Sequence, residues 1–69
     1  MLTAHQHQLK TQVFTAINNN QLSAAHQLLV KQLQYDATDH FCYYLLAEVN
    51  IAAGDSYKAI QLIEKALTL

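Results

Sequence analysis

Helix-breaking residues are almost absent from this chain, which has no proline and a single glycine, Gly54, among its 69 residues. In a helix interior, glycine costs about 1 kcal/mol relative to alanine, and proline costs about 3 kcal/mol. A chain with so few breakers is free to be helical over most of its length. The few segments that favour turns therefore decide how many helices the chain forms.

Three short segments favour turns. Residues 18–20 are consecutive asparagines, whose side chains compete with helical hydrogen bonds. Residues 36–39 contain two candidate N-caps, Thr38 and Asp39. Gly54 suits the left-handed end of a helix, and Asp55 follows it as an N-cap for the next one.

These turns predict four helices, at about 3–18, 21–35, 39–53 and 55–68. In each segment apolar residues recur at steps of three and four, which is the helical period. The short connections make neighbouring helices antiparallel. The predicted fold class is therefore all-α, and a four-helix bundle with a closed core is one arrangement open to it.

The second and fourth predicted helices carry similar residues at a fixed offset of 34 residues, the period of the tetratricopeptide repeat. The matched pairs are Ala25 with Ala59, Leu29 with Ile63, and Leu33 with Leu67.

The second half of the chain resembles the tetratricopeptide repeat family, and residues 54–60 resemble the turn between the two helices of such a repeat. Ala47 and Ala59 take the small positions, where the two helices come close. The residues that carry the resemblance in the second copy are Tyr43, Leu46, Ala47, Asn50, Ala59 and Ile63. The corresponding positions of the first copy hold Leu9, Gln12, Val13 and Ala16, and Gln12 departs from the leucine of the family pattern.

The resemblance implies a single domain over residues 1–69, with repeat one at about 3–36 and repeat two at about 37–69. The two antiparallel helix–turn–helix repeats would form a short right-handed α-solenoid. In this family the first helix of each repeat lines a concave groove that binds a partner. The implied groove residues here are His7, Lys10, Phe14, Ile17, Asn18, Phe41, Tyr44, Glu48 and Ile51.

Composition also indicates a contact surface. Hydrophobic residues make up 52% of the chain and charged residues 13%, against a usual charged share of about 25%. A chain of this size cannot bury so much apolar surface, and exposed apolar patches mark contact sites. Ile60, Leu67 and Leu69, in the last helix and at its end, form the predicted oligomer interface. A homodimer through this helix and a longer protein that continues past it both remain open.

Charge and targeting signals narrow the partners. The net charge is −1, with four lysines and no arginine, so neither nucleic acid nor an anionic membrane is an expected partner. The N-terminal residues do not form a signal peptide, and no apolar run approaches the length of a membrane span. A soluble cytoplasmic location is the expectation.

No catalytic or cofactor-binding motif is found. His5 and His7 are two residues apart and so point in different directions on a helix, and nothing near them completes a metal site. Cys42 and His40 have the same unfavourable spacing, so a buried structural cysteine is expected rather than a nucleophile. We expect no enzyme activity, no cofactor and no metal.

The sequence thus predicts a scaffold or adaptor module that binds a protein or peptide. Two alternatives remain: an accessory or oligomerisation segment of a larger protein, such as an enzyme, and a histidine-dependent metal site.

Overall fold

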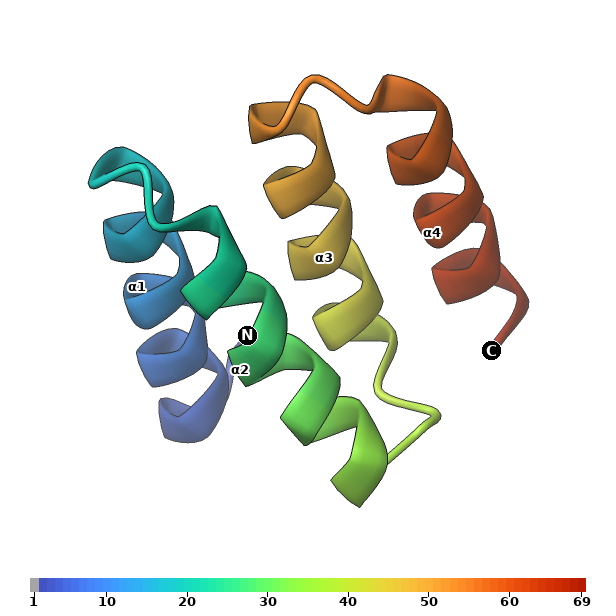
Figure 1. Cartoon of the computed structure of the whole chain (residues 1–69). Helices are drawn as coiled ribbons and strands as arrows, with labels where there is room; N and C mark the ends of the chain where they lie inside the picture. The colour runs from blue at the N-terminus through green and yellow to red at the C-terminus, as the bar shows by residue number, and fades with distance from the viewer. Residues whose placement is uncertain (1) are drawn as a thin grey trace.

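A computed structural model describes residues 2–69, and within them the chain forms four α-helices and no strand, as the sequence predicts. The helices are α1 (Ala4–Asn18), α2 (Leu22–Tyr35), α3 (His40–Ala52) and α4 (Ser56–Thr68). Figure 1 shows them side by side in chain order, with each connection joining neighbours. Met1, where the predicted domain begins, lies outside the described residues.

Side-chain caps explain where three of the helices begin. At α1, Thr3 Oγ1 accepts from the Gln6 N–H at 3.1 Å, while Gln6 Oε1 accepts from the Thr3 N–H at 2.8 Å. This reciprocal pair is a capping box. Asp39 caps α3 and Asp55 caps α4, each through a side-chain oxygen that accepts from the backbone N–H three residues later. Of the two candidate caps before α3, Asp39 is thus the one used.

The two turns inside the helical hairpins have the same backbone geometry, 34 residues apart. Asn20 has φ 58° and Gly54 has φ 83°, so both lie in the left-handed region that lets a helix end and the chain reverse. The matching hydrogen bonds are Asn20 N–H to Ile17 O and Gly54 N–H to Ile51 O, then Gln21 N–H to Ala16 O and Asp55 N–H to Asn50 O.

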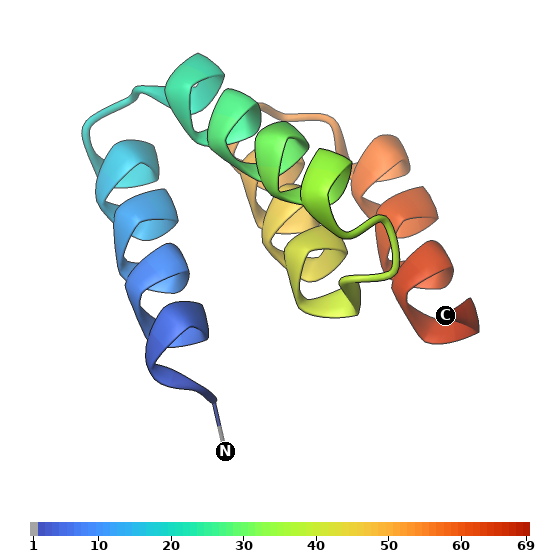
Figure 2. The ribbon, with the colours of Figure 1, turned by 90° about the horizontal axis from the view of Figure 1, so that it is seen from below.

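Helix α3 contacts each of the other three helices. It packs against α1 and α2 on one side and α4 on another, whereas the backbone of α4 approaches only α3. Figure 2 shows α1 diverging from α2, while α3 and α4 run close together. The core is a cluster of buried apolar side chains from the first three helices: Leu9, Val13, Ala25, Leu29, Cys42, Leu45, Leu46 and Val49.

Small residues lie where α3 and α4 approach each other. Ala47 on α3 is 1% exposed and Ala59 on α4 is 2% exposed. A larger side chain at either position could not reach solvent without moving a helix. This burial agrees with the prediction that both positions are small because the helices come close there. Ala25, 34 residues before Ala59, is buried in the first hairpin.

Candidate functional site

An apolar pocket of about 290 Å³ opens between the N-terminal half of α3 and the C-terminal half of α4. The aromatic rings of Phe41 and Tyr44, one helical turn apart, form one wall, with their centroids 6.2 Å apart and an angle of 34° between their planes. The lining residues are His40, Phe41 and Tyr44 from α3 and Ile63, Ala66 and Leu67 from α4. The pocket is open to solvent and can receive an apolar side chain.

Exposed apolar residues continue from this pocket along both helices. Tyr44 and Ile51 on α3 are seven residues apart, and Ile60, Ile63 and Leu67 on α4 follow steps of three and four, so each set shares one side of its helix. Their exposed fractions are 42% and 52% on α3, and 55%, 39% and 81% on α4. We call these five residues the α3–α4 face.

Other sides of these two helices are buried or half-buried. On α4, Ala59 is buried and Leu62 is half-buried. On α3, Cys42, Leu45, Leu46 and Val49 are buried in the core cluster. The α3–α4 face is therefore apolar surface that remains after the core has been built. Glu48 is the acidic member of its α3 side, at the position between Tyr44 and Ile51, and it is half-buried.

The residues of the predicted groove fall into three groups. Phe14 and Ile17 of α1 and Phe41 of α3 are half-buried and pack against the core cluster, although Phe41 also reaches the pocket. Lys10 is exposed on α1 and does not line this pocket. Tyr44, Glu48 and Ile51 lie together on one side of α3, as the spacing predicts. The first-repeat members are thus separated from the pocket.

The residues of the predicted oligomer interface lie next to the predicted groove residues of α3. Ile60 and Leu67 are exposed on α4, and Leu69 is exposed just beyond its end. Leu67 lines the same pocket as Phe41 and Tyr44. Part of the predicted groove and part of the predicted interface therefore form one continuous surface.

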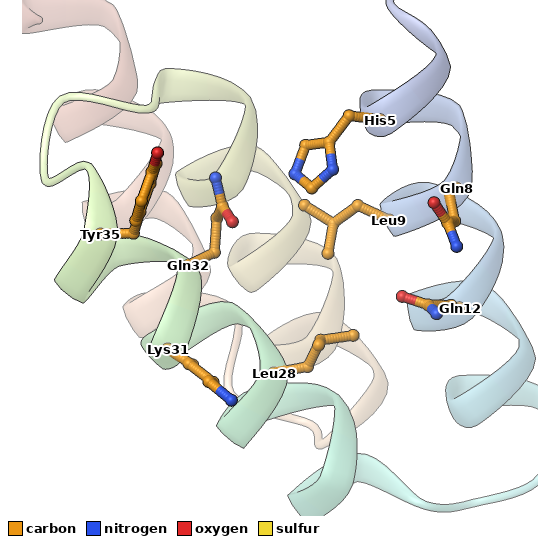
Figure 3. Close-up of a pocket in the computed structure, with 8 residues that line it drawn as sticks. All are labelled: His5, Gln8, Leu9, Gln12, Leu28, Lys31, Gln32 and Tyr35. Carbon is orange, nitrogen blue, oxygen red and sulfur yellow. The ribbon is translucent and has the colours of Figure 1, made fainter.

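A second pocket, of about 370 Å³, lies between α1 and α2 and was not predicted (Figure 3). It exists because the two helices diverge from their turn. The sequence signal that could have indicated it is the spacing of His5, Gln8 and Gln12, whose steps of three and four form a polar side of α1. The lining residues are His5, Gln8, Leu9 and Gln12 from α1, and Leu28, Lys31, Gln32 and Tyr35 from α2.

Cys42 is buried, as predicted. Its Sγ–H donates to the carbonyl oxygen of Leu29 at 3.2 Å, which ties α3 to α2. Burial, with a smaller contribution from the negative charge of Asp39, raises the pKa of the Cys42 thiol to about 12. The thiol is thus protonated at neutral pH, and only a thiolate acts as a nucleophile.

Asp36 has a structural role in the turn before α3. Asp36 accepts from the hydroxyl and the N–H of Thr38, at 2.7 and 3.0 Å, and these bonds lower the pKa of its carboxyl group. Within residues 2–69, no three His, Cys, Asp or Glu side chains come together as a metal site would require.

None of the described helices is long and apolar enough to cross a membrane. Comparisons with protein-family models, with curated proteins and with solved structures found no match to this chain.

Proposed function

We propose that this chain is a tetratricopeptide-like interaction module that binds another protein through the α3–α4 face and has no catalytic activity of its own. The observation that carries the proposal is the exposure of five large apolar side chains on one side of two adjacent helices. Contiguous exposed apolar surface on a small domain marks a site of protein contact.

Three features support a repeat architecture. The sequence has a 34-residue period, which is that of tetratricopeptide repeats. The two hairpin turns repeat their left-handed residue and their hydrogen bonds at this spacing. Helix α3 packs on both helices of the first hairpin, and α4 packs on α3 alone, as expected for units stacked in a row rather than for a closed bundle.

The chemistry of the face indicates the kind of partner. An apolar strip with a pocket suits an amphipathic helix that inserts a large side chain between Tyr44 and Leu67. Glu48 lies on the same side of α3 as Tyr44, so a partner with a basic residue near its apolar stripe gains an ion pair. Polar atoms are few, so binding depends on burial of apolar area more than on hydrogen bonds.

The test is affinity capture from a cell extract followed by mass spectrometry, with wild-type protein and two tyrosine variants. Tyr44→Ala removes one of the two rings that form a wall of the pocket, whereas Tyr35→Ala removes an exposed tyrosine of the α1–α2 pocket, outside the α3–α4 face. We expect a protein that wild type and Tyr35→Ala capture and that Tyr44→Ala loses. Identical capture by all three would contradict binding at this face.

A further inference from the structure

The two hairpins of the chain carry opposite charge. Residues 1–35, which include α1 and α2, contain two lysines and no aspartate or glutamate, whereas residues 36–69 contain two lysines and all five acidic residues. With histidine neutral, the formal charge is +2 for the first part and −3 for the second. The first hairpin therefore attracts an anionic partner, although the whole chain is slightly negative.

The pocket between α1 and α2 combines this positive charge with an apolar floor (Figure 3). Leu9 is buried and Leu28 is half-buried, and both line the pocket. Lys31 is exposed beside them, and none of the described residues that line the pocket is acidic. At about 370 Å³ the pocket is at the small end of the range for ligand sites, about 300–1,000 Å³.

The charges around the pocket place an anion at one of its ends. Gln32, at one end, donates from Nε2 to Asp39 Oδ2 at 3.2 Å. An anion at that end would be repelled by the Asp39 carboxylate. Lys31 lies toward the other end, with Gln12 on the facing helix (Figure 3). A negatively charged group is therefore expected beside Lys31.

The amides at the rim of the pocket indicate a peptide. Gln8 and Gln12 are exposed on α1, one helical turn apart, and each side-chain amide both donates and accepts hydrogen bonds. A peptide backbone offers the complementary N–H and C=O groups. The pocket is open to solvent, whereas a small-molecule site encloses about 70–90% of its ligand. An extended segment that passes over the opening fits this shape better than an enclosed small molecule.

We infer that the α1–α2 pocket binds an extended acidic peptide segment of another protein, with an apolar side chain over Leu9 and Leu28 and a carboxylate beside Lys31. The two side chains are two positions apart in the peptide, because alternate side chains of an extended chain lie on the same side. A nucleic acid is disfavoured, since its binding depends on several phosphate contacts and the pocket offers one lysine.

This site goes beyond the proposed function, because it is a second surface on the other hairpin. No residue of the α3–α4 face lines it. Nor does any of the groove residues that the tetratricopeptide resemblance implies, since the pocket lies between the two helices of one hairpin rather than along the first helices of both.

Titration of the ¹⁵N-labelled protein with a blocked tripeptide, acetyl-leucyl-seryl-glutamyl amide, tests the inference by NMR. Low ionic strength is used because salt screens exposed charges. Amide shifts are expected around Gln8, Gln12 and Lys31. The same peptide with glutamine in place of glutamate is expected to bind about two- to five-fold more weakly, which is the usual contribution of one exposed charge pair.

Two lysine variants separate a specific contact from general attraction. Lys31→Gln removes the cation of the pocket and is expected to bind both peptides equally. Lys10→Gln is the matched control, because it removes the same charge from an exposed site on α1 that does not line the pocket, and it should keep the preference for glutamate. Lys31→Glu should reverse the preference, in favour of a peptide with lysine in place of glutamate. Circular dichroism checks that each variant keeps its helices.

Absence of shifts with the glutamate peptide overturns the inference. Equal loss of the preference in Lys31→Gln and Lys10→Gln also overturns it, because the attraction would then be diffuse. Equal shifts with acetate or with a single-stranded oligonucleotide overturn a peptide ligand. The result is separable from the proposed function, because Tyr44→Ala, which alters the α3–α4 face, should bind the peptide as wild type does.

Discussion

Replacing Ala59 with leucine tests whether close approach of α3 and α4 sets the size of this residue. Ala59 is 2% exposed, on the most closely packed helix pair of the chain. Leucine adds three carbon atoms that cannot turn to solvent without moving α4. Such overpacking costs about 1–3 kcal/mol.

The cost is large relative to the expected stability. At roughly 0.05–0.15 kcal/mol per residue, a chain of 69 residues has about 3.5–10 kcal/mol of total stability. A destabilisation of about 1–3 kcal/mol would lower Tm by about 4–24 °C, because each kcal/mol shifts a domain of this size by about 4–8 °C.

Urea unfolding followed by circular dichroism measures the effect, at a concentration low enough to keep self-association from adding stability. Ala24→Leu is the matched control, because Ala24 is exposed on α2 and leucine is nearly as good a helix former as alanine. Its free energy of unfolding should change by less than about 0.5 kcal/mol. Equal midpoints for the two variants would refute both the close approach and the repeat alignment.

Three further results are expected. Gly54→Ala should lower the free energy of unfolding in urea by about 1–2 kcal/mol, because Gly54 has φ 83°. Asn20→Gly, at φ 58°, should not lower it. Unchanged stability of Gly54→Ala would contradict the left-handed turn. The buried Cys42 thiol, with its pKa raised to about 12, should react with a disulfide reagent at mildly alkaline pH only as the chain unfolds in urea; rapid reaction of the native protein would show that it is exposed. Hydrogen bonds from Thr38 lower the folded-state pKa of Asp36, so their contribution to stability is present above its ordinary pKa of 3.8 and is lost as pH falls through the lower folded value. Thr38→Val should raise the folded-state pKa of Asp36 in an NMR titration. An unchanged pKa would exclude the Thr38 hydroxyl as the cause of the shift.

Local sequence signals were sufficient to predict the four helices and where each begins and ends. The asparagine run, Asp39 and Gly54-Asp55 end or begin helices where the sequence predicts, because capping and left-handed turns depend on only a few neighbouring residues. The resemblance to tetratricopeptide repeats placed Tyr44, Glu48 and Ile51 together on one side of α3, and the excess of apolar residues made Ile60 and Leu67 candidates for exposure on α4, where both are exposed.

Spacing along one helix did not decide which apolar residues are buried. Phe14 and Tyr44 were both predicted to line a groove, yet Phe14 packs against the core and Tyr44 is partly exposed. The difference arises because α3 lies against the first hairpin, while the same side of the second hairpin is uncovered. Nothing in the local sequence around either residue carries that information.

The sequence by itself determined four helices with their caps and turns, because these depend on contacts between residues close in the chain. It also contained the 34-residue correspondence between the two halves, which follows from residue identities alone. The tertiary structure alone decided that α1 and α2 diverge to leave a pocket, and that Leu67 meets Phe41 and Tyr44 in another. Both depend on how helices pack across distances in sequence that no local pattern records. The union of the predicted groove and the predicted interface into one apolar face is likewise a product of packing.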